Sequence, residues 1–316
     1  MKRRAIMLTA IIMGLLMTAP AGAAEYNYQL MSGPMGGSWY PLGGAIAEIL
    51  NKSIPGLTIG VQPGAGITNV KAVGLKKTEL GFSNACSAVD GILGRAPFTE
   101  ETTNVKHMLT LYYQYFQATV PKDIGIKSIG DLKGKRICPM PKGNTGEQMS
   151  RHALQVYGLS YNDMAKVNYG SYTDSVNLIK DGHADVYLPV TTVPASSIMD
   201  LNSVRPVRIL AFPDDKIAAL QKINSGYKKR VIPANSYDGV DYDVPTFGTY
   251  THLIVGANVP DDLVYKMTAI LVENVGKLSQ VVTAMKGANA EFMASDVGVP
   301  YHAGAMKYFK EKGLIK

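Results

Sequence analysis

Short runs of β-branched and aromatic residues alternate with helical patterns along most of this chain, and this alternation constrains the fold more than any other feature. Between residues 26 and 94, three expected strands are each followed by an expected helix, and a second series of the same kind covers 135–212. A long amphipathic helix is expected over 261–281. Because a helix between two strands returns the chain to the same edge of the sheet, the pattern predicts parallel sheets with helices on their faces.

Two long extended runs separate and close these series, and they predict two lobes. Residues 105–121 and 244–260 are rich in tyrosine or β-branched residues and lack a helical period. Two crossings of this kind fit a two-lobed α/β clamshell. We expect one lobe to comprise residues 25–120 plus 246–316 and the other to comprise 121–245, with a ligand cleft between them.

The first residues have the parts of a secretory signal. A basic start at 2–4 precedes an apolar stretch, and the small residues at 21–23 form a cleavage site. We therefore expect residues 1–24 to be a cleaved signal peptide and the mature chain to be exported, most simply into a bacterial periplasm. An uncleaved membrane anchor is the alternative, but the apolar part is shorter than the ~20 residues that a span needs.

The charge balance is mildly basic and indicates no polyanionic partner. Without the three basic residues of the signal, the formal charge falls from +7 to +4. The basic clusters at 133–136 and 228–230 lie among no stacking aromatics, so we expect them in solvated turns and expect no nucleic-acid partner. Cys86 and Cys138 are the only cysteines, and we expect them to remain unpaired thiols.

Helix starts that follow strands are the best candidates for a ligand site. In open α/β sheets, ligands lie beyond the carboxyl ends of strands, where helix N-termini offer N–H groups and positive charge to an anion. The glycine-rich loop at 32–44 matches no nucleotide fingerprint, so it fits a small polar ligand better. Asn84 can cap the next helix, and Thr145 opens a capping box. Residues 171–174 form another cap-like start, and Pro194 suits the first turn of a helix.

No catalytic or metal-binding pattern is present, so we expect neither an enzyme nor a metal or cofactor site. The chain has no G-x-S-x-G elbow, and its five histidines show no H-E-x-x-H or H-x-H spacing. The acidic turn at 238–243 lacks the pattern of a calcium hand. An exported enzyme on the same two-lobed fold stays open as an alternative, because catalytic groups scattered along the sequence would escape a motif search.

Six segments occur in the order seen in one family of transport proteins. They are "GGSWYPLGGAIAEIL", "GAGITNVKAV", "DLKGKRICPMPKGNTGEQ", "DGHADVYLPVTTVPASSIMDL", "VPDDLVYKMTAILVEN" and "VPYHAGAMKYFKEKG". Together they resemble the TAXI family, the extracytoplasmic solute receptors of TRAP transporters, over essentially the whole mature chain. The resemblance implies a periplasmic-binding-protein-like (type II) clamshell. It also implies closure on a small organic acid, such as a glutamate-like amino acid or a dicarboxylate, and delivery to the membrane subunits of a TRAP permease.

The helix starts and the resemblance together give a set of expected ligand contacts. These are Gly37, Ser38, Trp39, Tyr40, Thr68, Asn69, Ser83, Asn84, Tyr115, Lys142, Asn144, Thr145, Gly146, Tyr172, Thr191 and Thr192. Gly36 also belongs to the matching glycine-rich loop, and Lys142 is a hypothetical counter-ion for a carboxylate. Trp39 stands where the family commonly has tyrosine, so no specific ligand is carried over.

We expect the receptor to be a monomer, because it must present one face to its permease. A ligand sensor that presents its closed state to a signalling receptor is a further alternative to transport.

Overall fold

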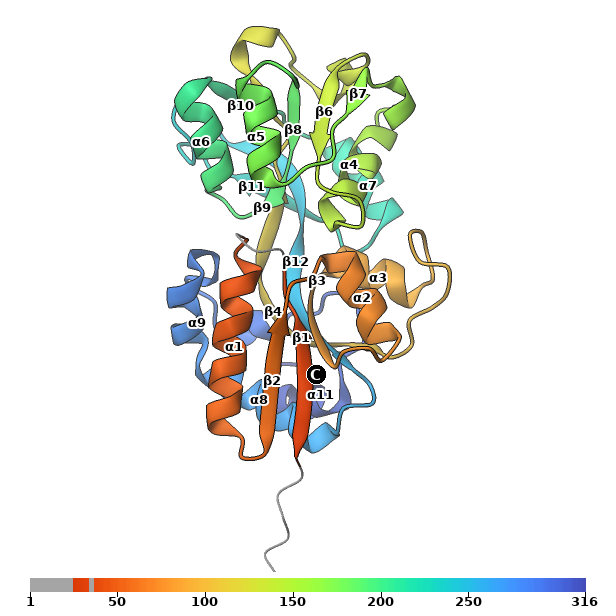
Figure 1. Ribbon diagram of the computed structural model, residues 1–316, viewed down its shortest axis with the longest axis vertical. Coiled ribbons are helices and arrows are strands. Elements are labelled where there is room, and N and C mark those ends of the chain that lie inside the picture. The colour runs from red at the N-terminus through yellow and green to blue at the C-terminus, as the bar shows by residue number, and fades with distance from the viewer. Residues whose placement is uncertain (1–24, 34–36) are drawn as a thin grey trace, which may run out of the picture.

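The protein folds into two lobes connected by extended strands (Figure 1). The computed structural model describes residues 25–33 and 37–316, so the expected signal peptide at 1–24 and Gly36 lie outside the described residues. We call the lower body in Figure 1, built on the larger sheet, lobe I, and the upper body lobe II. This two-lobed α/β architecture confirms the predicted fold class.

Lobe I is built on a mixed sheet with the strand order β2-β1-β3-β12-β4-β9, in which β11 also pairs with β12. The strands are β1 (Tyr26–Met31), β2 (Leu57–Gln62), β3 (Leu80–Asn84), β4 (Val105–Phe116), β9 (Val190–Thr191), β11 (Lys228–Ile232) and β12 (Val244–Gly256). Of these, β9 and β11 pair with the ends of β4 and β12 that reach lobe II (Figure 1). β1 pairs in parallel with β2 and β3. This is the arrangement that helical crossovers between consecutive strands produce.

Helices cover both faces of the lobe I sheet. They are α1 (Trp39–Ser53), α2 (Gly66–Gly74), α3 (Ala85–Ile92), α8 (Asp261–Glu273), α9 (Val275–Val281), α10 (Ala290–Met293) and α11 (Ala303–Glu311). On α1, Leu42, Ile46 and Leu50 recur at a spacing of four and are fully buried, so one face of this helix packs on the sheet. α8, α9 and α11 share the core of α1, whereas α2 and α3 form a second core on the opposite face.

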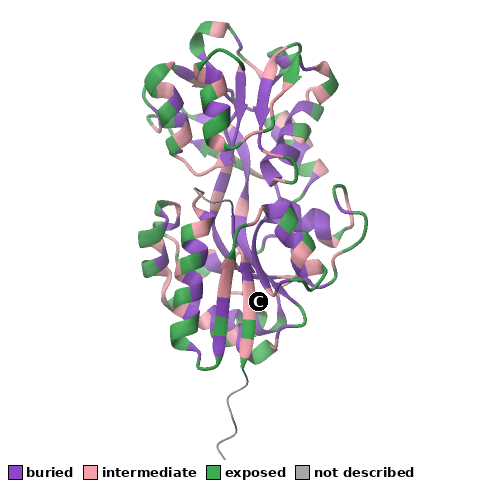
Figure 2. Cartoon of the chain, in the orientation of Figure 1, coloured by how far each residue is buried: buried purple, intermediate pink, exposed green. Residues whose placement is uncertain are grey.

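Lobe II is a smaller three-layered body on a sheet with the order β10-β5-β8-β6-β7. Its elements are β5 (Thr119–Pro121), β6 (Arg136–Pro139), α4 (Thr145–Gln155), β7 (Lys166–Val167), α5 (Tyr172–Lys180), β8 (Val186–Leu188), α6 (Ser196–Val204), β10 (Val207–Ile209) and α7 (Asp214–Ile223). α4 and α7 contribute to one core and α5 and α6 to another. Figure 2 shows buried strands between helices whose outer faces are exposed.

The two extended runs become the long strands β4 and β12, which pair antiparallel from Val105 and Gly256 to Tyr115 and Gly248. The chain leaves lobe I at the end of β4 and continues as β5 in the sheet of lobe II. It returns through β12, so both connections lie side by side (Figure 1).

Two local expectations are wrong. The helix expected over 261–281 is divided into α8 and α9, because Asn274 leaves the helical conformation and its side-chain amide donates to the Ile270 carbonyl at 2.8 Å. The basic cluster at 228–230 begins strand β11 instead of a turn. Its backbone pairs with β12, and hydrogen bonding to that long strand decides its conformation. No helix in 25–33 or 37–316 is long and apolar enough to cross a membrane.

The lobes also contact each other directly, where α3 of lobe I meets α4 and the turn after α7 of lobe II. The Ser87 and Thr145 hydroxyls lie 2.8 Å apart. The Gln148 amide donates to Asp90 Oδ2 at 2.8 Å, and this bond is buried. We call this contact the interlobe seam; its residues are Cys86, Ser87, Asp90, Arg95, Thr145, Gln148, Asn224 and Gly226.

Candidate ligand-binding site

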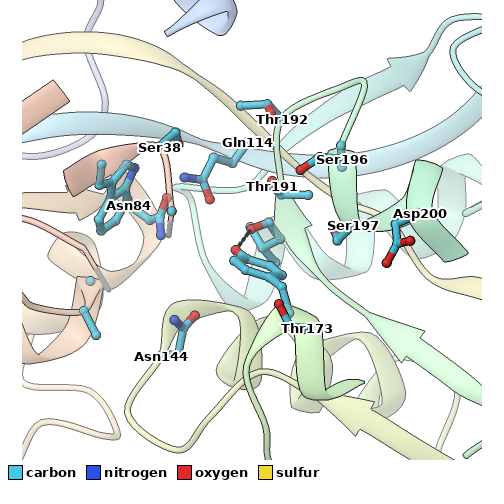
Figure 3. Close-up of a pocket in the computed structure, with 17 residues that line it drawn as sticks. Ser38, Asn84, Gln114, Asn144, Thr173, Thr191, Thr192, Ser196, Ser197 and Asp200 are labelled. Carbon is cyan, nitrogen blue, oxygen red and sulfur yellow. Dashed lines mark hydrogen bonds between the residues drawn. The ribbon is translucent and has the colours of Figure 1, made fainter. Parts of the chain in front are cut away.

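A cavity of about 370 Å³ lies between the two lobes. Its wall consists of Gly37, Ser38, Trp39, Ala65, Gly66, Asn84, Gln114, Asn144, Tyr172, Thr173, Val190, Thr191, Thr192, Ala195, Ser196, Ser197 and Asp200. Figure 3 shows Ser38 and Asn84 of lobe I on one side and Ser196 of lobe II on the other, with Gln114 of β4 between them. A molecule in this cavity would therefore contact both lobes.

Six helices begin at this cavity. The first residue or the N-cap residue of each of α1 to α6 lines it: Ser38, Gly66, Asn84, Asn144, Tyr172 and Ala195. In α1, α2, α3 and α6, the N-cap side chain makes no capping hydrogen bond. The first N–H groups of a helix lack intrahelical acceptors and carry partial positive charge, so this convergence favours a bound anion.

Asn84 is the clearest unpaired polar group of the wall. It is 3% exposed, and its Oδ1 atom has no hydrogen-bond partner within the described part of the chain. The residue occupies the N-cap position of α3, as predicted, but its side chain does not cap the helix. A buried polar atom without a partner costs about 1–3 kcal/mol. Because the Asn84 Oδ1 atom accepts hydrogen bonds, a ligand hydroxyl or ammonium group that donates to it would remove this cost.

Ser38 and Trp39 bring the glycine-rich loop to the cavity. The Ser38 hydroxyl lies 3.0 Å from the Tyr112 hydroxyl of β4. The Trp39 ring stacks on Phe82, with centroids 5.6 Å apart and planes 24° apart, and the residue is only 8% exposed. Trp39 therefore serves as core on one side and as cavity wall on the other.

Gln114 connects the cavity to both lobes through the crossing strand β4. Its amide is assigned so that the nitrogen donates to the Val190 carbonyl at 3.3 Å. The oxygen then accepts from Trp39 Nε1 and from the Thr251 hydroxyl, each at 3.1 Å. Gln114 thus bonds to the glycine-rich loop of lobe I and to β9 beside lobe II.

The lobe II wall is rich in hydroxyl groups. The Tyr172 hydroxyl donates to the Val190 carbonyl at 2.9 Å. Burial raises the pKa of Tyr172 to about 12, although a hydrogen bond with Thr191 acts in the opposite direction. The phenol therefore stays neutral at physiological pH. Thr192 contributes its side chain to the wall, and its carbonyl accepts from the Gln117 amide at 2.9 Å.

The cavity wall carries almost no side-chain charge. None of its described residues is lysine or arginine, and Asp200 is its one carboxylate. The Lys142 ammonium lies 4.8 Å from the centroid of the Tyr169 ring and does not line the cavity. The hypothesis that Lys142 neutralises a bound carboxylate is therefore not supported by this geometry, because a cation–π contact holds its charge elsewhere.

The structure brings half of the expected contact residues together. Those that line the cavity are Gly37, Ser38, Trp39, Asn84, Asn144, Tyr172, Thr191 and Thr192. Those that do not are Tyr40, Thr68, Asn69, Ser83, Tyr115, Lys142, Thr145 and Gly146. Each member of the second group lies one to three positions from a lining residue, and most have other partners.

Asn69 and Ser83 are bonded to the protein itself. Asn69 is buried, its amide nitrogen donates to the carbonyls of Ser32 and Phe82, and its oxygen accepts from the Ala65 N–H. The Ser83 hydroxyl is also buried and bonded to backbone carbonyls. We therefore assign both residues to the frame beneath the cavity.

Two predicted helix starts are displaced by one or two residues. Asn144, and not Thr145, is the N-cap of α4, because the Asn144 side chain accepts from the Gly146 N–H at 2.8 Å. Thr145 is therefore the first helical residue, and its hydroxyl belongs to the interlobe seam. Pro194 lies before α6, whose N-cap is Ala195. By contrast, the capping box of Ser171 on α5 is present.

Sequence reasoning missed one residue on β4 and one helical stripe. Gln114 was missed because the two-residue period of a strand indicates on which face a side chain lies, but not which element packs against that face. Ser196 and Asp200 on α6 are four residues apart and so share a face of the helix. This polar stripe directly after a predicted helix start was the available signal.

Metal binding and thiol chemistry find little support among the described residues. Among residues 25–33 and 37–316, no group of three histidine, cysteine, aspartate or glutamate residues could hold a metal ion. Cys86 and Cys138 are unpaired, as predicted, and both are buried. Burial raises the pKa of the Cys86 thiol to about 12 and that of Cys138 to about 11, so neither forms a thiolate readily.

The fold is similar to that of solved periplasmic binding proteins. PhnD1 from Prochlorococcus marinus, solved with methylphosphonate, aligns over 92% of this chain and 98% of its own, with 11% identity and a TM-score of 0.59. The alkanesulfonate-binding protein SsuA from Xanthomonas axonopodis pv. citri, bound to MOPS, aligns over 91% and 84%, with 15% identity and a TM-score of 0.52. These likenesses define the class: the chain has the fold of a periplasmic solute-binding protein.

The family follows from the sequence match. Residues 30–313 match the model of the NMT1-like family, so the chain belongs to this family. A structure from a study of glutathione import through GshT and the cystine ABC importer TcyBC of Streptococcus mutans is also similar. It aligns over 87% of this chain and 99% of its own, with 16% identity and a TM-score of 0.52.

Proposed function

We propose that this protein is an exported receptor that captures a small organic acid between its lobes and delivers it to a membrane transporter. The observation that carries the proposal is the convergence of six helix N-termini on a cavity whose described wall has no lysine or arginine. Such a site stabilises an anionic group through backbone N–H groups and helix dipoles. The unpaired Asn84 Oδ1 atom can accept from a hydroxyl or ammonium group of the same ligand.

Closure follows from the position of the cavity. A ligand that contacts both lobes stabilises the closed arrangement by the difference between its affinities for the closed and open forms. The segments at 118–121 and 244–248 would absorb the rotation, because the chain passes between the lobes at these two places. Gln114 lies beside this crossing and in the cavity wall, so it is suited to couple ligand contact to rotation.

We further propose that the transporter is a TRAP permease and the ligand a glutamate-like amino acid or a dicarboxylate. The six segments that resemble the TAXI receptors support this choice. A receptor for an ABC importer is the second candidate, favoured by the likeness to the structure from the cystine-importer study. The neighbouring genes discriminate: large multi-span subunits without an ATPase support TRAP, and an ATPase gene supports ABC. A neighbouring histidine kinase would instead favour a ligand sensor.

The remaining parts of the proposal concern the mature chain. We propose that residues 1–24 are removed on export to the periplasm. We retain the division into 25–120 plus 246–316 and 121–245 as the two units that rotate. We propose a monomer that binds its ligand and releases it unchanged to the transporter.

Native mass spectrometry of gently purified mature protein tests the proposal. We expect added mass that disappears on denaturation and fits a small organic acid. Asn84→Leu should lose this mass, whereas Asn162→Leu, a change at an exposed asparagine outside the cavity, should keep it. Protein that carries nothing, and gains no thermal stability from amino acids, dicarboxylates or keto acids, would contradict the proposal.

A further inference from the structure

The lobe II end of the cavity differs chemically from the end formed by Asn84. Three lining residues come from one helix, α6: Ser196, Ser197 and Asp200. In Figure 3 they lie on the opposite side of the cavity from Asn84 and Ser38. The end near Asn84 offers helix N-termini and an unpaired amide, whereas this end adds a carboxylate.

The Asp200 carboxylate retains free hydrogen-bonding capacity. Its Oδ1 accepts from the Lys180 ammonium at 2.7 Å, and no hydrogen bond of the described residues reaches Oδ2. The Asp200 side chain is 58% exposed and that of Lys180 is 20% exposed. Lys180 itself does not line the cavity. A ligand would therefore meet acceptor oxygens here, with the balancing charge behind them.

From this geometry we infer that Asp200 selects for a hydrogen-bond donor at the far end of the ligand, so that amino acids and hydroxy acids bind in preference to dicarboxylates. The inference rests on the proposed function and narrows its ligand class. An ammonium or hydroxyl group donates to a carboxylate, whereas a second ligand carboxylate has no proton to donate and carries like charge. The described wall holds no basic side chain that could offset this repulsion.

The test compares acids of equal length that differ only at the far end. We would measure the dissociation constants of 4-aminobutanoate, 4-hydroxybutanoate and succinate by calorimetry at neutral pH. The five-carbon set of 5-aminopentanoate, 5-hydroxypentanoate and glutarate covers a second length. We expect the amino acid to bind tightest and the dicarboxylate weakest, with about a tenfold difference between them.

Two variants with opposite effects isolate the role of Asp200. Asp200→Asn keeps a polar side chain of equal size but removes the charge, and it should reduce the tenfold preference to about twofold. Lys180→Met leaves Asp200 without its balancing charge, so the preference should widen. Asp241→Asn, a change at an exposed carboxylate outside the cavity, should leave it unchanged.

The outcomes separate the inference from the proposed function. Acids that bind with the dicarboxylate preferred, or a preference that Asp200→Asn leaves intact, would overturn the inference while the receptor proposal stands. Failure of every acid to bind would overturn both. The expected result is that the amino acids bind tightly and that Asp200→Asn weakens their binding more than it weakens the binding of the dicarboxylates.

Discussion

Two neighbouring sets of buried polar groups lie between the lobes. Those of the seam have hydrogen-bond partners within the protein, whereas several of those in the cavity wall have none. In the interlobe seam, polar groups of the two lobes bond to each other: the Asn224 amide donates to the Cys86 backbone carbonyl at 2.9 Å, and the Gln148 amide donates to the Asp90 carboxylate. In the cavity, Asn84 and the N-termini of several helices lack such partners. The hydrogen bonds of the seam therefore need no ligand, whereas the unpaired groups of the cavity gain partners only when a ligand binds.

The largest effect should come from exchanging Asn69, the fully bonded asparagine beneath the cavity, and comparing it with the unpaired Asn84 of the cavity wall. Asn69→Leu removes four hydrogen bonds and leaves buried backbone groups unpaired, so we expect the free energy of unfolding to fall by about 3–4 kcal/mol. Asn84→Leu should change it by less than about 1 kcal/mol, because no hydrogen bond is lost. Urea unfolding measures both.

For ligand affinity, the order of the two variants should be reversed, with the larger loss in Asn84→Leu and the smaller in Asn69→Leu. Asn84→Leu should weaken organic-acid binding by at least about tenfold, as the loss of a buried hydrogen bond does. Equal losses of stability in the two variants would show that Asn84 has a structural role, and the contrast between the two regions would disappear.

A methyl group placed in the seam should have the next largest effect. At Gly226 an added Cβ would lie 2.6 Å from both the N and Cα atoms of Cys86, so the backbones of the two lobes must separate. We expect Gly226→Ala to lower the free energy of unfolding by about 2–3 kcal/mol. Small-angle scattering should show a larger radius of gyration without ligand.

Gly276→Ala is the matched control, because no atom lies within 4 Å of its added Cβ. Gly276→Ala should change the free energy of unfolding by no more than about 0.5 kcal/mol. It should leave the radius of gyration unchanged. If Gly226→Ala behaved like this control, the seam would not be what holds the lobes together.

Asp90 gives the seam a pH dependence. Burial raises the pKa of Asp90 from 3.8 to about 6, although Arg95 and Gln148 act in the opposite direction. The folded protein therefore binds the proton more tightly than the unfolded chain, and Asp90 contributes stability that is lost as the pH rises from about 4 to about 6. Relative to Asp90→Asn, the native protein should lose about 2 kcal/mol across this window. Parallel stability curves for the two proteins would contradict this assignment.

The smallest effect should come from a helix start that satisfies itself. The Ser171 hydroxyl accepts from the Asp174 N–H at 3.2 Å, and this capping box is exposed. Ser171→Ala should lower the free energy of unfolding by about 1 kcal/mol. Ligand affinity should stay unchanged, because the Ser171 side chain is not part of the cavity wall. A tenfold loss of affinity would mean that the cap positions α5 for the ligand.

The alternation of strands and helices was sufficient to predict the fold class and most elements. Between residues 26 and 94, three strands are each followed by a helix, from β1 to α3, as expected, because each element carries its own apolar period and turn signals. β11 was missed because its sequence is basic and its conformation comes from pairing with β12. The expected helix at 261–281 was divided by the local conformation of Asn274, which periodicity does not report.

The candidate site was predicted less completely than the fold. Helix starts such as Asn84 and Tyr172 were found because cap chemistry is local. Neighbouring polar residues could not be sorted, since Asn69 and Asn84 look alike in sequence and differ only in what surrounds them. Gln114 and Asp200 reach the cavity from β4 and α6, and no local signal brings these two elements together.

The sequence by itself determined which segments become strands or helices, because period and capping act between residues close in the chain. It also determined that helix N-termini would gather beyond the strand ends of each lobe. The tertiary structure alone decided which of those ends face a common cavity, which polar groups bond to each other across the seam, and which remain unpaired. The physical reason is that hydrogen-bond satisfaction between lobes depends on the packing of segments far apart in sequence.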